Sequence, residues 1–144
     1  MRGRIPIAMP LEISSLNLAV QRLAEGLIRY ELDREDIQIR DGLVQRFEFT
    51  YELSCKLLRR YLEMPSANPV EIDALTFQDL IRTANEQGLL LGEWLDWKQY
   101  RDMRARTSHT YYEVMAIEVV NGIPKFLDEA KTLRDRLALR ILID

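Results

Sequence analysis

Apolar residues recur at steps of three and four along most of this chain, and this spacing limits its fold more than any other feature. It is the period of an amphipathic helix that buries one stripe. Ser14 or Ser15 is placed to cap the first such helix. The stripe of this helix consists of Leu16, Val20, Leu23, Leu27 and Tyr30. No segment alternates strictly enough to predict a strand, so the chain is predicted to be all-α.

Three further segments have helical spacing. The segment from Arg40 to Leu62 has the widest apolar face, which predicts a central helix with two neighbours. Two prolines then predict a loop over residues 64–69. A shorter helix is expected between Thr76, as its cap, and Gly88. Another is expected from Gly92 to about Arg106.

The last segment begins after Thr110, and Pro124 predicts a kink or break before residues 126–143. Short turns between these segments predict an antiparallel four- to five-helix up-and-down bundle. The length of 144 residues is near the commonest domain size. Residues 1–144 are therefore predicted to form one domain, with residues 1–13 as a flexible or irregular extension.

Amino-acid composition indicates the cellular compartment and excludes one class of nucleic-acid-binding protein. Cys55 is the only cysteine, so no intramolecular disulfide is available and a reducing compartment is indicated. No apolar run is long enough for a signal peptide or a membrane span, which predicts a cytoplasmic protein with no membrane partner. The net charge of −3 argues against a protein that coats nucleic acid, because that role needs a broad basic face. Any RNA contact is expected to be local.

Missing motifs exclude several enzyme classes. A di-iron bundle needs Glu-x-x-His pairs, and no glutamate stands three residues before His109, the one histidine. There is no Gly-rich phosphate loop and no Gly-Ser followed by an Asp-x-Asp pair, so the chain does not supply nucleotidyl transfer by itself. No metal or cofactor is predicted. Trp94, Trp97, Tyr100 and Met103 are interpreted as core, not as a platform for base stacking.

The segment from Arg104 to Tyr111 carries the candidate chemistry. Thr110 and Glu113 have the N-cap and N3 spacing of a capping box, although Ser108 is an alternative cap. Either cap places His109 at a helix N-terminus and Tyr111 at or just inside the first turn of the same helix. There the unpaired N–H groups and the helix dipole favour an anion such as phosphate.

Basic residues gather around the same segment. Lys98, Arg101, Arg104 and Arg106 make this corner locally positive within an acidic protein. The guanidinium forks of Arg104 and Arg106 add donors for phosphate oxygens. Arg106, Ser108, Lys98 and Arg101 are the predicted phosphate- or RNA-binding residues.

His109 is suited to act as a general acid or base near neutral pH, while Arg104 stabilises charge on a pentavalent phosphate. RNA suits this chemistry because its 2′-hydroxyl is an internal nucleophile. In the alternative interpretation, His109 and Arg104 only satisfy carbonyls and caps at helix ends. Arg106 is then a solvated surface charge and Tyr111 an ordinary half-buried aromatic residue. Residue types and spacing leave both interpretations open.

Longer stretches of the sequence are similar to a known family. They read RDGLVQRFEFTYEL at 40–53, FQDLIR at 77–82 and RARTSHTY at 104–111, with Trp97, Ala84 and Gly88 in addition. Together they resemble the nucleotidyltransferase substrate-binding family of the HEPN superfamily, over roughly residues 14–140. The chain departs from many relatives at Ala105, where a polar residue is frequent, and at Cys55, where a bulky aromatic is common.

The resemblance implies a helical bundle like the C-terminal domain of kanamycin nucleotidyltransferase, usually dimeric and encoded beside a minimal nucleotidyltransferase. In that superfamily the Arg-x4-His pattern, here Arg104 and His109, is a metal-independent ribonuclease site. In its extended form the tyrosine, here Tyr111, is adenylylated by the partner, and the pair acts as toxin and antitoxin.

The proton transfers of RNA cleavage add one expectation. RNA cleavage usually needs an acid and a base, and each chain offers one histidine, so a two-fold homodimer is predicted to place Arg104 and His109 of both chains around one cleft. Its contact surface is expected to include residues 94–111. Three functions stay open: a toxin that cleaves RNA such as tRNA, a non-catalytic subunit that holds a substrate for the transferase, and a structural dimerisation module.

Overall fold

The computed structural model describes residues 8–63 and 75–143, with side chains described over 13–63 and 75–141. These residues contain helices and no strand, which confirms the all-α prediction. None of the described helices combines the length and the apolar composition that a membrane span requires. The elements are α1 (Ala8–Leu32), α2 (Ile37–Glu63), α4 (Phe77–Glu86), α5 (Trp94–Arg106), the 3-10 turn η1 (Thr107–His109) and α6 (Glu113–Ile143).

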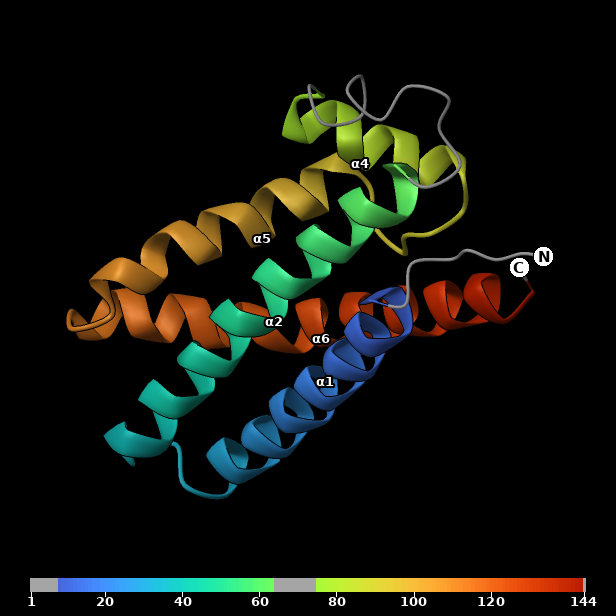
Figure 1. Cartoon of the computed structure of the whole chain (residues 1–144). Helices are drawn as coiled ribbons and strands as arrows, with labels where there is room; N and C mark the ends of the chain where they lie inside the picture. The colour runs from blue at the N-terminus through green and yellow to red at the C-terminus, as the bar shows by residue number, and fades with distance from the viewer. Residues whose placement is uncertain (1–7, 64–74, 144) are drawn as a thin grey trace.

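The long helices form two antiparallel pairs (Figure 1). α1 and α2 make one hairpin, and α5 and α6 make the other, with η1 at the far end of the second pair. α4 lies across the end of the bundle where α2 finishes and α5 begins. α6 packs against α1 and α2 as well as α5. This arrangement confirms the predicted antiparallel bundle.

α2 occupies the centre because its wide apolar face contacts α1 on one side and α5 and α6 on the other. Phe47 is fully buried and meets the Phe126 ring edge-on, with centroids 5.0 Å apart. Trp97 and Tyr100 of α5 pack on the same ring of Phe126. The aromatic residues of α5 are therefore core, as predicted, except that Trp94 is only half-buried.

α1 begins earlier than predicted. Residues 8–13 are helical and not an irregular extension, whereas residues 1–7 lie outside the described part of the chain. Ser14 and Ser15 therefore lie within the helix and neither caps its start. The physical reason is that Ile13 is partly buried against the core, so the apolar stripe starts one turn before Leu16.

α6 runs unbroken through Pro124, so of the kink or break predicted there the break is wrong. A proline inside a helix removes one backbone hydrogen bond and costs roughly 3 kcal/mol. Ile123 and Phe126 are fully buried on either side of it, and full burial of such a side chain is worth about 1.5–3 kcal/mol. Packing on the core thus holds the helix together across the proline.

The predicted ends of the short helix α4 are confirmed. The Thr76 hydroxyl accepts a hydrogen bond from the Asp79 N–H at 3.1 Å, which satisfies one unpaired donor of the first turn. After the helix, Gly88 has a φ of +74°, a conformation that glycine adopts without a steric penalty. The loop predicted over residues 64–69 lies outside the described residues.

A buried carboxylate fixes the chain just before α5. Glu129 of α6 is 1% exposed and accepts hydrogen bonds from the N–H groups of Leu91 and Gly92, at 2.7 and 2.8 Å. Burial raises the pKa of Glu129, and these two hydrogen bonds oppose that rise. A Cβ at position 92 would lie 2.7 Å from Glu129 Oε1, so only glycine permits this approach.

Candidate functional site

The connection between α5 and α6 carries the predicted site residues. α5 ends at Arg106, and the chain then tightens into η1 instead of starting a new helix. Thr107 holds this turn: its hydroxyl donates to the carbonyl of Arg104 at 2.6 Å, and its carbonyl accepts from the Thr110 hydroxyl at 3.3 Å. These side-chain bonds compete with the start of a new helix.

The capping box predicted for this connection does not form. The Thr110 hydroxyl is used inside the turn, Ser108 lies within η1, and α6 begins only at Glu113. His109 ends η1 and Tyr111 lies in the following turn, so the prediction that they stand at or inside the N-terminus of α6 is wrong. Sequence spacing does not show that the Thr107 hydroxyl bonds back to α5.

Two carboxylates of α2 hold Arg104 in place. Its Nε and Nη2 donate to one oxygen of Glu52, at 2.9 and 2.5 Å, and Nη2 lies 3.1 Å from Glu48 Oε2. Its Nη1 donates to the Thr107 hydroxyl at 3.1 Å. The hydrogen bond to Glu52 is the main cause that raises the pKa of Arg104. A phosphate at Arg104 therefore has to displace these carboxylates or share the guanidinium with them.

The rings of His109, Tyr111 and Tyr112 lie side by side at the surface. The centroids of His109 and Tyr111 are 6.3 Å apart, and those of Tyr111 and Tyr112 are 4.3 Å apart. Tyr111 is 75% exposed, so it is not a half-buried aromatic residue and another molecule can reach its hydroxyl. Within the described part of the chain, no hydrogen bond or ion pair joins His109 to Arg104.

Two of the predicted phosphate-binding residues share this connection. Arg106 Nε lies 3.7 Å from Glu118 Oε1 of α6, and both side chains are about half exposed, as in a solvated surface pair. Ser108 is exposed in η1, one residue before His109. Both side chains are therefore exposed on the connection that carries His109.

The other two predicted phosphate-binding residues lie further along α5. Arg101 stacks its guanidinium over the rings of Phe77 and Trp94, 5.4 and 5.2 Å from their centroids. It therefore points toward the N-terminal end of α5. Lys98 is exposed one turn before Arg101. The structure does not bring these two residues together with His109.

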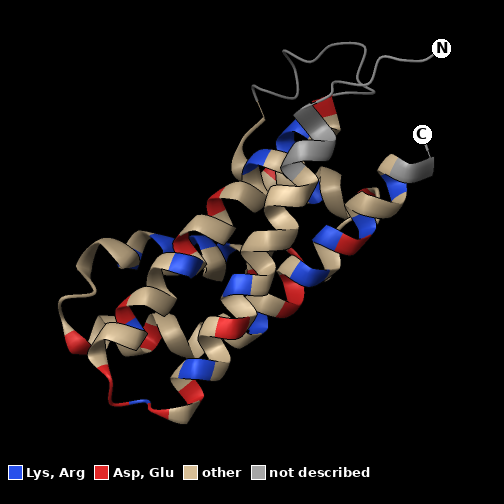
Figure 2. Cartoon of the chain, turned by 60° about the horizontal axis from the view of Figure 1, so that its bottom comes forward, with Lys and Arg blue, Asp and Glu red and all other residues tan. Residues whose placement is uncertain are grey.

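Acidic side chains surround the corner that the sequence predicts to be positive. Glu48 and Glu52 come from α2, and Glu113 and Glu118 come from α6. Figure 2 shows basic and acidic residues interleaved along the helices instead of gathered on one face. The corner therefore has mixed charge, because sequence neighbours do not show which acids the fold brings alongside.

Arg40 is a further cation near the connection, and sequence spacing did not single it out. It is 8% exposed, its Nη1 lies 3.6 Å from Glu113 Oε1, and its buried Nε has no hydrogen-bond partner. Arg40 near the start of α2 meets Glu113 of α6, whereas Glu48 and Glu52 further along α2 meet Arg104 of α5. A basic residue near the start of a helix gives no sign in the sequence that it will be buried.

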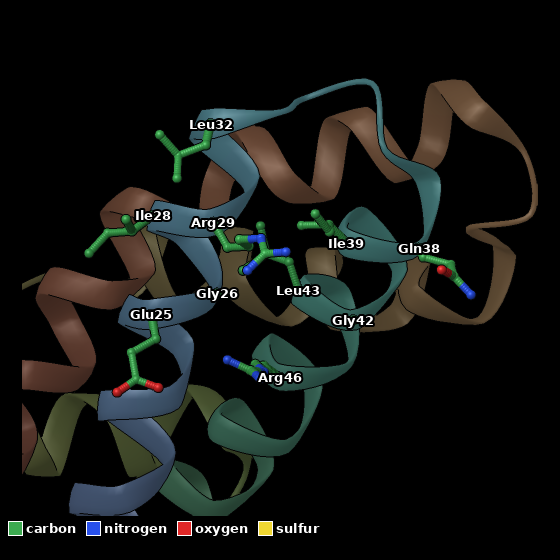
Figure 3. A pocket seen from close by; sticks show the side chains of 10 residues that line it. All are labelled: Glu25, Gly26, Ile28, Arg29, Leu32, Gln38, Ile39, Gly42, Leu43 and Arg46. Atoms are coloured by element: carbon green, nitrogen blue, oxygen red, sulfur yellow. The ribbon is translucent and has the colours of Figure 1, made fainter.

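A hollow of about 520 Å³ lies elsewhere, between α1 and α2 (Figure 3). Ile28, Leu32 and Ile39 give it an apolar surface, and Arg29 and Arg46 lie beside it. No residue of the α5–α6 connection lines this hollow. Among the described residues, no group of three His, Cys, Asp or Glu side chains is placed to hold a metal ion.

The fold matches that of a helical domain associated with nucleotidyltransferases. A solved structure of HI0074 from Haemophilus influenzae, described as the fold of a substrate binding domain of a nucleotidyltransferase, superposes with a TM-score of 0.81. The two proteins are 35% identical, and the match covers 88% of this chain and 98% of that one.

Sequence comparison gives the family. Residues 11–139 match the family described as nucleotidyltransferase substrate binding protein like, and the chain belongs to that family. It is also 42% identical to a protein of Haemophilus influenzae named probable ribonuclease HepT. The match extends over 99 residues, which are 69% of this chain and 67% of that protein. The family predicted from the sequence is thereby confirmed.

Proposed function

We propose that this chain is the ribonuclease subunit of a toxin–antitoxin pair, with Arg104 and His109 as its catalytic residues. The observation that carries the proposal is the α5–α6 connection, in which His109 is exposed beside Tyr111 and Arg104 is held at the end of α5. The name of the HepT relative, probable ribonuclease, supports the same class of activity.

In the proposed reaction the RNA supplies its own nucleophile. The 2′-oxygen attacks the adjacent phosphorus as a histidine removes its proton, and the bond from phosphorus to the 5′-oxygen breaks as that oxygen gains a proton. The products are a 2′,3′-cyclic phosphate and a 5′-hydroxyl. Arg104 stabilises the charge on the pentavalent phosphate, so it must loosen its contact with Glu52. Arg106 and Ser108 contact neighbouring phosphates of the RNA, such as a tRNA, and Lys98 and Arg101 extend this track along α5.

A homodimer supplies the second proton-transfer group. Tyr111, Tyr112 and Val114 are 75%, 58% and 69% exposed, which is unusual for large apolar or aromatic side chains so close together. We propose that Tyr112 and Val114 pack against a second copy, bring two His109 side chains to one cleft and leave the Tyr111 hydroxyl open to that cleft. Light scattering at micromolar concentration is expected to give twice the chain mass, and a monomer would contradict the proposal.

Regulation is proposed to act at Tyr111. Its hydroxyl oxygen attacks the α-phosphorus of ATP held by a partner minimal nucleotidyltransferase, a new O–P bond forms, pyrophosphate leaves and the hydroxyl proton passes to solvent. The added nucleotide then places its phosphate beside His109, where it competes with RNA. The exposure of Tyr111 and its position next to His109 support this role.

The test measures RNA cleavage and adenylate addition in the same preparations. His109→Ala and Arg104→Ala are expected to abolish cleavage, whereas Arg29→Ala, in an exposed residue of the hollow between α1 and α2, keeps it. With ATP, magnesium and the transferase, the wild type is expected to gain adenylate mass and lose cleavage. Tyr111→Phe gains none and stays active. If Tyr111→Phe also loses RNA cleavage after this incubation, the modified residue is not Tyr111.

A second candidate is a subunit that holds a substrate for the transferase without its own catalysis. Two observations favour this candidate. Arg104 is already paired with the carboxylates of Glu48 and Glu52, and the HI0074 fold is described as that of a substrate binding domain. This candidate predicts that His109→Ala leaves the transferase reaction intact and that no preparation cleaves RNA.

A further inference from the structure

Arg40 carries a buried charge whose hydrogen-bonding capacity is largely unused. A guanidinium has five N–H donors, yet Arg40 Nε is buried without a partner and Nη1 is 3.6 Å from the nearest carboxylate, that of Glu113. Burying an ion is costly unless it is paired and hydrogen-bonded. Arg40 therefore has donors that an anionic ligand beside Glu113 can pair with.

The first turn of α6 presents unpaired donors at the same place. α6 is 31 residues long, and its first backbone hydrogen bond runs from the Ala116 N–H to the Tyr112 carbonyl. The N–H groups of Glu113, Val114 and Met115 have no hydrogen-bond partner among the described residues. Such N–H groups, together with the positive end of the helix dipole, favour anions.

We propose that Arg40 and the first turn of α6 form a phosphate-binding site beside the α5–α6 connection. The Glu113 side chain is 72% exposed, so its carboxylate turns to solvent when a phosphate enters. The identity of the phosphate rests on the proposed function: it belongs either to the RNA or to a nucleotide on Tyr111, two residues before Glu113. Guanidinium and backbone N–H groups bind phosphate oxygens equally well from both sources.

Inorganic phosphate tests the site directly. Titration at constant ionic strength is expected to shift the amide resonances of residues 113–115 with one saturable dissociation constant. Arg40→Met removes the saturable shift, and Arg40→Lys, which keeps the charge but loses the fork, weakens binding on the order of tenfold. Arg29→Met, a matched loss of an exposed arginine, leaves the shifts unchanged. Shifts that are absent in the wild type, or equal in Arg40→Met, would overturn the proposal.

Stability is monitored in the same variants. Arg40→Met removes an incompletely paired buried charge, so its melting temperature is expected to be unchanged or higher in the absence of phosphate. If this variant does not fold, the Arg40→Lys titration decides, and an unchanged dissociation constant contradicts the site.

Two further measurements separate the sources of the phosphate. A KM for RNA cleavage that rises about tenfold in Arg40→Met at constant kcat assigns the site to RNA. An unchanged KM, with a different phosphorus resonance of adenylylated Tyr111 in Arg40→Met, assigns it to the nucleotide. A wild type that shows the amide shifts but cleaves no RNA supports the site and contradicts the proposed ribonuclease. RNA cleavage without amide shifts contradicts the phosphate site and supports the proposed ribonuclease.

Discussion

Arg104 on α5 and Glu52 on α2 lie 52 residues apart in sequence and are joined by two hydrogen bonds to one carboxylate oxygen. The pair links the central helix to the connection that carries His109. Because the Glu52 side chain is 54% exposed, the contact is a positioning interaction at the surface and not part of the core.

Arg104→Ala is therefore expected to lower the free energy of unfolding by only about 1 kcal/mol or less, since exposed ion pairs contribute little. Urea unfolding followed by circular dichroism measures this loss. Glu52→Gln, which removes the same charge pair from the other side, serves as the matched variant. A loss above about 3 kcal/mol in Arg104→Ala would show that the residue is mainly structural.

Phe47→Ala is expected to cost about 3–5 kcal/mol, because it empties a fully buried site against Phe126 and Tyr51. The same urea measurement applies, with Phe49→Ala as control, since Phe49 is 57% exposed on the same helix. A loss below about 1 kcal/mol would show that α2 is peripheral.

Alanine substitutions at two helix glycines are expected to change the stability of the protein in opposite directions. At Gly122 a Cβ would lie 2.6 Å from the Met103 sulfur, so in Gly122→Ala the buried Met103 side chain must change its rotamer, which is expected to cost about 1 kcal/mol. At Gly42 a Cβ meets nothing within 4 Å, so Gly42→Ala is expected to stabilise α2 by about 0.5–1 kcal/mol. Thermal unfolding of the two variants side by side gives the comparison. Equal effects would contradict the close contact between Gly122 and the Met103 side chain.

Cys55 is expected to react slowly with thiol reagents. Burial raises the pKa of its thiol to about 12, although the hydrogen bond with Tyr51 opposes that rise. At pH 8 the thiolate fraction is then roughly 1,000-fold smaller than at the ordinary pKa of 9.0. Iodoacetamide labelling followed by mass spectrometry is expected to be slower by about that factor in the folded protein than in urea. Equal rates would show that the thiol is not held in this environment.

Glu129 gives the stability a defined pH dependence. Its folded pKa is raised by burial above the ordinary value of 4.5, so between these two values the folded chain binds more protons than the unfolded chain. The contribution of Glu129 to stability is therefore present below pH 4.5 and is lost as pH rises through the folded pKa. Glu129→Gln removes this titration.

The measurement for Glu129 is the difference in unfolding free energy between Glu129→Gln and the wild type across pH 4 to 8. As pH rises, the unfolding free energy of the variant is expected to increase relative to that of the wild type. At every pH the variant also lacks one acceptor for the Leu91 or Gly92 N–H, which lowers its stability by a constant amount. A difference that moves the other way would mean that the hydrogen bonds outweigh burial.

Periodicity determined the helices and the core. The stripes of α1 and α2, the caps Thr76 and Gly88, and the burial of Trp97 follow from local spacing and turn chemistry, which act over a few residues. The segment from Arg104 to Tyr111 was also located from the sequence, because its residue types and its similarity to a family are properties of the chain itself.

The tertiary structure decided the surroundings of those residues. Glu48 and Glu52 meet Arg104, and Arg40 is buried beside Glu113, only because α2 packs against the α5–α6 connection. The start of α6 likewise depended on one hydroxyl, that of Thr110, which bonds back to the Thr107 carbonyl instead of capping α6. Contacts between side chains far apart in sequence have no local period, so spacing indicates which residues are charged or apolar but not which of them meet.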